Sequence, residues 1–236
     1  MSGLSFTPFR PSLRGFLIIA IALALVGFIG IRFSPPKLAA LRSAVPNPAT
    51  DAALPTPPGS QTAIFAGGCF WGMEALFEHV EGVSSVVSGY TGGSAETAHY
   101  KQVSAGGTGH AESVNITYDP SQVSYGQLLK VFFTVAHDPT QLNQQGFDMG
   151  TQYRSAIFFT QAEQKQIAQA YIEQLNQAKV FYQPIVTQVE PVDNFYSAET
   201  YHQQYVEQHP HNFYVTAVEL PKIDRFQKRF PDLYKP

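Results

Sequence analysis

The sequence predicts an α/β or α+β sandwich, a sheet covered by helices, from about residue 62 to the carboxyl end. Apolar runs of strand length alternate there with segments of helical periodicity, an order typical of such sandwiches. Two of the helical segments begin with a Ser/Thr-x-x-Gln/Glu capping box, which marks a helix start. Glycine-containing turns separate the runs, as expected between elements of one folded domain.

The first predicted strand, 62–66, is a short apolar run that ends at two glycines. A helix over about 69–80 follows, because apolar side chains recur at i, i+3, i+4 and i+7 from Met73 onward. A second strand covers 83–90. After a polar loop, apolar and polar residues alternate over 111–118, which predicts a third strand.

Capping boxes organise the second half of the domain. Ser124 with Gln127 begins one helix, and Thr160 with Glu163 begins another. In chain order, the predicted elements are a helix over 124–135, a long loop over 137–152, a strand over 153–160, a helix over 160–179, a strand near 185–190 and a short helix near 198–208.

The amino-terminal segment, residues 1–33, has the pattern of a membrane anchor. Residues 15–31 contain no charged side chain, and Arg14 and Arg32 flank them. As a helix this run spans roughly 26 Å, close to the ~30 Å hydrocarbon core of a bilayer once the arginines snorkel. We expect a single anchoring helix, although the flanking charges do not determine its side of the membrane. Cleavage as a signal segment, which would leave a secreted or periplasmic domain, is the alternative.

Residues 34–61 contain seven of the 17 prolines of the chain. Such a segment reads as an extended, semi-rigid linker, so we expect the folded domain to be 62–236. The composition is 44% hydrophobic and 14% charged, and the net charge of -3 gives no basic face for nucleic acid. The single cysteine excludes an intramolecular disulfide and a four-cysteine metal site.

That cysteine, Cys69, lies where a strand, a glycine turn and a helix meet. At a helix N-terminus, unpaired N–H groups and the helix dipole stabilise a thiolate, so we expect a lowered thiol pKa. The alternative is a small buried hydrophobe. Phe70 and Trp71 follow at the helix start, where their rings could border an opening that suits a methyl-bearing ligand.

Glu112 is the first candidate for a proton donor. It shares one face of the predicted strand 111–118 with apolar side chains, where desolvation would raise its pKa and suit a general acid. The opposite interpretation, a solvated charge at a strand end, fits the spacing equally well. His110 or His137 could serve a thiol hydrolase as base. We expect most of the seven histidines to be loop or surface residues, and none has metal-ligand spacing.

Six motifs occur in one order along the domain: GCFWG at 68–72, GYTGG at 89–93, TGHAE at 108–112, HDP at 137–139, GTQYRS at 150–155 and YHQQY at 201–205. Over about 62–234 the chain resembles the A-class peptide methionine sulfoxide reductases, MsrA. The resemblance implies a two-layer α/β sandwich with a mixed sheet and a ferredoxin-like core. It implies reduction of the S epimer of free and protein-bound methionine sulfoxide, by a monomer with no bound metal or organic cofactor.

The resemblance also implies roles for single residues. Cys69 matches the nucleophile that attacks the sulfoxide sulfur, and Glu112 matches the acid that protonates its oxygen. Tyr100 and Tyr153 match the tyrosines that hydrogen-bond this oxygen, and Asp148 belongs to the same polar network. Phe70 and Trp71 match the pocket for the S-methyl group.

The chain departs from many relatives because it has no resolving cysteine. The tail through Pro236 contains neither cysteine nor glycine, and Ser104 stands between Val103 and Ala105. The sulfenic acid left on Cys69 must then be reduced by an external thiol, from thioredoxin, from glutathione with glutaredoxin or from a membrane-associated dithiol protein. Three readings follow: a membrane-anchored reductase that repairs oxidised proteins, a one-cysteine peroxidase or thiol hydrolase, and an idle module that binds oxidised methionine.

Overall fold

The computed structural model describes residues 44–52 and 59–236. The predicted anchor at 15–31 lies outside these residues. The α-helices are α2 (Phe70–Glu78), α3 (Tyr100–Ala105), α4 (Tyr125–Val131), α5 (Ala162–Gln177), α6 (Tyr205–Gln208) and α7 (Leu220–Arg229). The strands are β1 (Gln61–Gly67), β2 (Val83–Thr91), β3 (Ala111–Tyr118), β4 (Gln144–Gln145), β5 (Asp148–Met149), β6 (Ser155–Phe159), β7 (Gln188–Pro191) and β8 (Phe195–Ser197).

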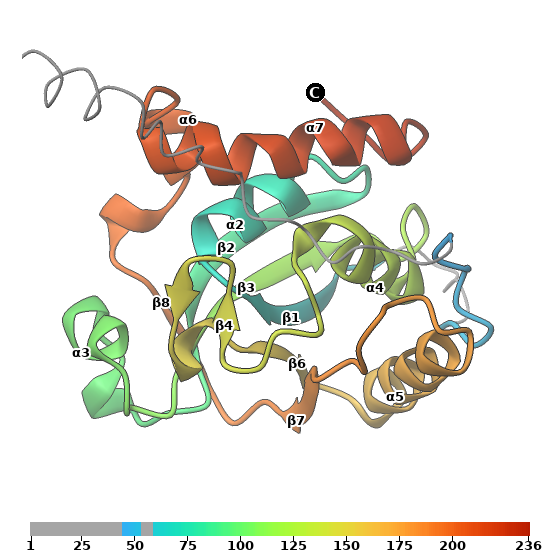
Figure 1. Ribbon diagram of the computed structural model, residues 1–236, viewed down its shortest axis with the longest axis horizontal. Coiled ribbons are helices and arrows are strands. Elements are labelled where there is room, and N and C mark those ends of the chain that lie inside the picture. Colours follow the sequence, from blue (N-terminus) through green and yellow to red (C-terminus); the bar gives the residue numbers. More distant parts are fainter. Residues whose placement is uncertain (1–43, 53–58) are drawn as a thin grey trace, which may run out of the picture. The chain divides into compact units, whose positions relative to one another are not determined.

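Six strands form one mixed sheet in the order β7-β6-β1-β3-β2-β8 (Figure 1). Neighbouring strands are antiparallel except β6 and β7, which run parallel. The four middle strands and two helices follow the chain order β1-α2-β2-β3-α4-β6. This arrangement places the carboxyl end of β1 beside the amino end of β3. Cys69 follows β1 and Glu112 lies near the start of β3, so the two residues are brought together.

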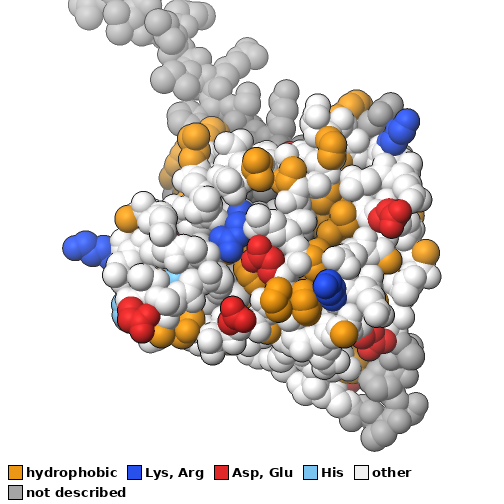
Figure 2. All heavy atoms as spheres, turned by 90° about the horizontal axis from the view of Figure 1, so that it is seen from below, with side chains coloured by type: hydrophobic (Ala, Val, Ile, Leu, Met, Phe, Trp, Pro, Cys, Tyr) orange, Lys and Arg blue, Asp and Glu red, His pale blue; other side chains and the backbone are white. Residues whose placement is uncertain are grey.

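The sheet has two unequal faces because strand side chains alternate. Ala63, Phe65 and Ile157 face the large core that the helices cover. Ile64 and Phe158 face the opposite side, where a smaller cluster is packed against Val192 and Phe195. Figure 2 shows the molecule from below, where hydrophobic side chains lie among a few acidic and basic ones. The fold is therefore a mixed α/β fold with its main core on one side of the sheet.

Of the two predicted capping boxes, one is confirmed and one is wrong. Ser124 and Gln127 exchange both capping hydrogen bonds at the start of α4. At α5 the N-cap is Gln161, without a side-chain cap. Thr160 instead donates its backbone N–H and its hydroxyl to Oε1 of Gln164. Gln164 also donates to the carbonyl of Thr62, so a tertiary contact replaces the local cap.

Several elements have no counterpart in the sequence prediction, and β8 is one of them. α3 lies in the predicted polar loop, and the β4–β5 hairpin lies in the predicted loop 137–152. The tail after α6 forms a π-helical turn, Val215–Glu219, followed by α7. α7 packs against α2, so the last part of the chain covers the helix that begins at Cys69 (Figure 1).

Part of the predicted linker contacts the domain. Val45 is buried in the main core, and the carbonyl of Pro46 accepts a hydrogen bond of 2.7 Å from the hydroxyl of Tyr171. Asp51 accepts hydrogen bonds from the N–H of Gly126 (2.8 Å) and the hydroxyl of Ser124 (2.5 Å) at the start of α4. Within the described residues, no helix is both long and apolar enough to cross a membrane.

We expect Asp51→Ala to lower the free energy of unfolding by about 1 kcal/mol, because it removes a carboxylate that caps α4. Urea denaturation of the domain measures the change. Thr50→Ala, at the exposed neighbouring position, is the control. Equal stability of the two variants would show that residues 45–51 do not hold α4 in solution.

Candidate active site

Cys69 is the N-cap of α2, directly after the turn that leaves β1. The turn requires glycine at position 68, where φ is +95° and a Cβ would lie 2.7 Å from the side chain of Gln145. The strand, the glycine turn and the helix are thus placed as the sequence predicts. Only 9% of Cys69 is exposed, so the thiol lies mostly inside the domain.

Glu112 lies near the start of β3 and points inward. Its exposed fraction is 2%, and Val114, Ile116 and Tyr118 on the same strand face are also buried. The interpretation of Glu112 as a solvated charge is therefore wrong. Its Oε2 accepts a hydrogen bond of 3.1 Å from the backbone N–H of Phe70, the first residue of α2. The helix that carries Cys69 thereby fixes the carboxyl.

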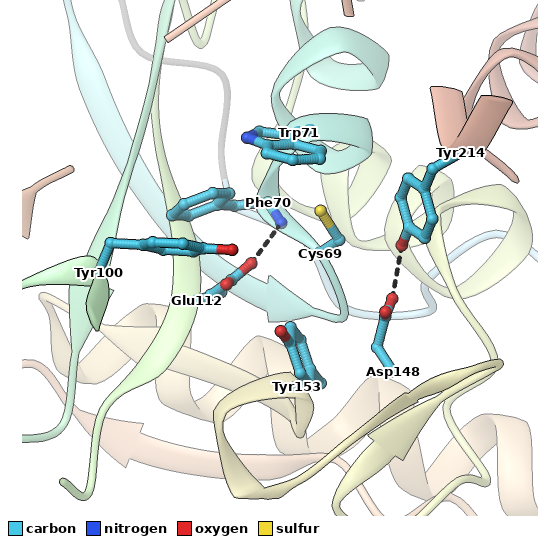
Figure 3. Close-up of a pocket in the computed structure, with 8 residues that line it drawn as sticks. All are labelled: Cys69, Phe70, Trp71, Tyr100, Glu112, Asp148, Tyr153 and Tyr214. Carbon is cyan, nitrogen blue, oxygen red and sulfur yellow. Dashed lines mark hydrogen bonds between the residues drawn. The ribbon is translucent and has the colours of Figure 1, made fainter. Parts of the chain in front are cut away.

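A cavity of about 290 Å³ brings the predicted residues together (Figure 3). Its walls are formed by Cys69, Phe70, Trp71, Tyr100, Glu112, Asp148, Tyr153 and Tyr214. Seven of these eight are the candidates from the sequence. In Figure 3 the hydroxyls of Tyr100 and Tyr153 point toward Glu112, and the indole of Trp71 lies above the thiol. The cavity thus combines a thiol, a carboxyl, hydroxyl donors and an aromatic wall.

Burial, together with the charges of Asp148 and Glu219, raises the pKa of Glu112 to about 8. The hydrogen bond from Phe70 opposes this shift but does not outweigh it. At neutral pH the carboxyl is therefore mainly protonated, as a proton donor must be.

The expectation of a lowered thiol pKa is wrong. Burial raises the pKa of Cys69 well above its usual range, and Glu112, Glu219 and Asp148 raise it further. The backbone N–H of Trp71 lowers it, which is the helix-terminus effect that the sequence predicts. Desolvation and three nearby carboxyl groups outweigh this hydrogen bond, so Cys69 rests as a thiol.

Tyr100 and Tyr153 are held by contacts outside the cavity. The backbone N–H of Tyr100 donates to Glu199 (3.0 Å), and the other oxygen of Glu199 accepts from the hydroxyl of Tyr90 (2.9 Å). Tyr153 ends a short 3₁₀ turn whose Thr151 carbonyl accepts from Arg154. Burial raises the pKa of both cavity tyrosines, so their hydroxyls stay protonated and can donate.

Ring contacts and a hydrogen bond hold the aromatic wall in place. Trp71 stacks on Tyr205 with ring centroids 3.6 Å apart, and its Nε1 donates to Nδ1 of His202 (3.0 Å). The ring of Phe70 packs against His202 and Tyr90. This wall leaves an apolar space beside the thiol.

Sequence reasoning missed Tyr214 and Glu219. The hydroxyl of Tyr214 donates to Asp148 (2.5 Å) inside the cavity. Glu219 is fully buried against Gly72 and pairs with buried Lys222 at 2.6 Å. The sequence does contain a signal that could have predicted the burial of Glu219 and Lys222. At helical spacing these two residues fall on the same face as Val215 and Phe226, which are buried.

We expect Gly72→Ala to destabilise the domain by about 1–3 kcal/mol, because a new Cβ must fit into a filled site. That Cβ would lie 1.6 Å from Oε2 of Glu219, whose ion pair with Lys222 limits its movement. Thermal unfolding measures the loss. Gly59→Ala, at a position with nothing within 4 Å, is the matched control. A Gly72→Ala variant as stable as this control would contradict the position of Glu219.

Histidine and metal chemistry find no support at this site. His79, His99, His209 and His211 are exposed or half-buried, as expected for most of the histidines, whereas His110, His137 and His202 are buried. None of the described histidines lines the cavity. His137 is held between the carbonyl of Phe132 and the hydroxyl of Ser155, and burial lowers its pKa to about 3. No group of three potential metal ligands occurs in the described ranges.

Comparison with known proteins gives a consistent result. Residues 61–233 match the family described as peptide methionine sulfoxide reductase. The chain is 59% identical over 177 residues to MsrA 2 of Mesorhizobium japonicum, covering 75% of this chain and 91% of that protein. It is 54% identical over 193 residues to MsrA 2 of Synechocystis sp., covering 81% and 90%.

Solved structures of similar fold include methionine sulfoxide reductase A of Corynebacterium diphtheriae, with 35% identity and a TM-score of 0.58 over 77% of this chain and 93% of that one. Reduced Mxr1 of Saccharomyces cerevisiae has 32% identity and a TM-score of 0.60 over 65% and 88%.

Proposed function

The chain belongs to the peptide methionine sulfoxide reductase family, and on this premise we propose how its cavity performs the reaction. It is an oxidoreductase of the A class that reduces methionine sulfoxide to methionine. One observation carries the assignment of roles: Cys69 and a protonated Glu112 line the same cavity. We infer that the β1-α2-β2-β3-α4-β6 arrangement is the ferredoxin-like core of this family.

The S-methyl group of the substrate binds against Phe70 and Trp71, and the sulfoxide oxygen faces Glu112, Tyr100 and Tyr153. Glu112 donates its proton to this oxygen, which makes the sulfur electrophilic. Sγ of Cys69 attacks the sulfur as the thiol proton leaves, and a proton returns Glu112 to its acid form. The new bond between the two sulfur atoms and the sulfur–oxygen bond of the substrate then break as the hydroxyl group passes to Sγ, which releases methionine. Methionine is reduced by two electrons, and Cys69 is oxidised to a sulfenic acid.

Asp148 and Tyr214 complete the polar side of the cavity. Burial raises the pKa of Asp148, whereas its hydrogen bond from Tyr214 lowers it. The hydrogen bond between them fixes two more oxygen atoms in the cavity wall. We propose that this asymmetry, with a methyl site on one side and oxygen donors on the other, selects the S epimer.

Regeneration requires an external thiol, since Cys69 is the single cysteine of the sequence. A first thiol condenses with the sulfenic acid to form a mixed disulfide and water, and a second thiol releases reduced Cys69. We propose that thioredoxin, or glutathione with glutaredoxin, supplies these electrons. Residues 15–31 would hold the enzyme at a membrane through a single helix, with 34–61 as the linker to the catalytic domain.

The deciding experiment measures methionine formation from each sulfoxide epimer, with dithiothreitol and then with thioredoxin or glutathione systems. The proposal expects turnover of the S epimer with at least one system. Consumption of hydroperoxide without sulfoxide would favour a peroxidase, and thiol-independent release of an acyl product would favour a hydrolase. A single turnover with every donor would favour a binding module. Membrane flotation of the full chain and of a variant that lacks residues 1–33 tests the anchor.

A further inference from the structure

A second cavity adjoins the catalytic one. Its volume is about 540 Å³, and it lies among α2, α6 and α7, which stack together in Figure 1. Trp71 lines both cavities. We call the second cavity the acidic groove, because three of its lining residues are Glu74, Glu78 and Glu207. A substrate bound at Cys69 and a group bound in the acidic groove would therefore both lie beside Trp71.

The charges that face the acidic groove are mostly negative. α2 contributes Glu74 and Glu78, α6 contributes Glu207, and the α7 residues that line the groove, Leu220 and Ile223, are apolar. Burial and the charge of Glu78 raise the pKa of Glu74 to about 7. Burial and the charge of Glu207 raise the pKa of Glu78. These carboxyl groups thus repel one another, and a bound cation would relieve the repulsion.

The basic groups beside the groove are engaged with the backbone. Nζ of Lys235 donates to the carbonyl of Val83 (2.5 Å), although its charge still lowers the pKa of Glu78. Nδ1 of His79 is 3.0 Å from the carbonyl of Lys235. Among the described residues, no basic side chain forms an ion pair with Glu74, Glu78 or Glu207. The groove therefore keeps its negative charge.

The carboxyl group of Glu74 gives a second, independent indication that the groove binds a hydrogen-bond donor. The residue is 1% exposed, and its Oε2 accepts from the hydroxyl of Ser88 (3.1 Å) and the N–H of Gln204 (2.9 Å). Its Oε1 is buried and has no hydrogen-bond partner among the described residues. An unpaired buried carboxyl oxygen costs free energy, which a donor that enters the groove would recover.

A flexible organic cation fits the groove better than a metal ion. No three carboxylate or histidine groups of the described chain come close enough to hold a metal. Trp71, Tyr205 and Ile223 provide apolar walls along which the methylene stem of lysine or arginine can pack while its charged end meets the carboxylates.

We propose that the acidic groove is a subsite for a lysine or arginine side chain near the oxidised methionine of a protein substrate. The proposal rests on the proposed function, because the methionine sulfoxide at Cys69 brings the flanking residue to the groove. The enzyme would then reduce methionine sulfoxides in basic segments faster than those in neutral or acidic ones.

The test uses short peptides with one methionine-S-sulfoxide and a single lysine, norleucine or glutamate, placed in turn at each position within three residues of it. At one position or more, we expect kcat/KM for the lysine peptide to exceed that for the norleucine peptide about three- to tenfold, through KM, with glutamate slowest. Raising the salt concentration should shrink this ratio. The Glu78→Gln, Glu207→Gln double variant should bring the ratio close to one, whereas Glu163→Gln, Glu173→Gln on α5 removes equal charge and should keep it.

If the wild-type enzyme has the same kcat/KM for the lysine, norleucine and glutamate peptides at every position, the subsite proposal is wrong. This outcome does not depend on whether the double variant folds. A lysine preference that survives in the double variant would also overturn it. Free methionine-S-sulfoxide separates the two proposals, since it carries no flanking side chain. If neither the free sulfoxide nor any peptide is reduced, the proposed function fails; if the free sulfoxide is reduced and the peptides are not distinguished, only the subsite fails.

Discussion

Replacing Glu112 with glutamine is expected to slow methionine-S-sulfoxide reduction by about 10²–10⁴-fold, the usual contribution of a general acid. The amide has the shape of the carboxyl and can still accept the N–H of Phe70, so the cavity and KM should change little. It has no acidic proton to give to the sulfoxide oxygen. Single-turnover methionine formation by excess enzyme measures the effect without the reductant.

The pH dependence gives an independent check on the same residue. With a pKa of about 8 in the folded protein, Glu112 is the acid below this pH and loses its proton above it. The component of the single-turnover rate that needs this proton should therefore fall about tenfold for each pH unit above 8. Glu112→Gln should lack this component. A wild-type single-turnover rate in the variant would rule out Glu112 as the proton donor.

Glu112→Gln should also stabilise the folded protein at pH 7. Because burial raises the pKa of Glu112 from 4.5 to about 8, the stability that the wild type has below pH 4.5 is lost as the pH rises toward 8. At pH 7 this loss amounts to up to about 3 kcal/mol, which glutamine avoids. Thermal unfolding at pH 4 and pH 7 measures the difference, with Glu163→Gln as a surface control. An unchanged Tm at pH 7 would contradict the burial of the carboxyl.

Replacing Cys69 with serine is expected to abolish methionine formation under every reductant. An alcohol ionises far less readily than a thiol, and its oxygen cannot accept the sulfoxide oxygen to form a sulfenic acid. No second cysteine in the sequence can take over. Mass spectrometry after a single turnover should show one added oxygen on wild-type Cys69 and none on the variant.

The serine variant needs a control for folding, because Cys69 is mostly buried. Its Tm should stay close to that of the wild type, since serine has almost the size of cysteine. Methionine formation above about one part in a thousand of the wild-type rate would contradict a mechanism that depends on this nucleophile.

Local pattern predicted the place of Cys69 at a helix start and the strand that carries Glu112, but it left open whether Glu112 is buried. Two glycines after an apolar run specify a turn into a helix, and period-two alternation specifies the strand face of Glu112. The three strands at 62–66, 83–90 and 111–118 and the capping box at Ser124 follow from the same kind of signal. Motif order then identified the family, and Tyr100, Asp148 and Tyr153 through it.

The electrostatics of the site could not be predicted in this way. A helix N-terminus alone implies a lowered thiol pKa, yet burial and the charges of Glu112, Glu219 and Asp148 raise the pKa of Cys69. Two of these three carboxyl groups lie more than 70 positions further along the chain. Their approach depends on the folded sheet and tail, and desolvation has no local signature in the sequence.

By itself, then, the sequence determined the order of the main strands and helices, the family and seven of the eight residues that line the cavity, because these depend on short-range periodicity and motifs. Only the tertiary structure decided that the tail folds back as α7, that Tyr214 and Glu219 reach the site of Cys69 and that residues 45–51 dock on α4 and α5. These contacts join positions distant in the chain. Their stability comes from burial and hydrogen bonds that form only when the whole domain folds.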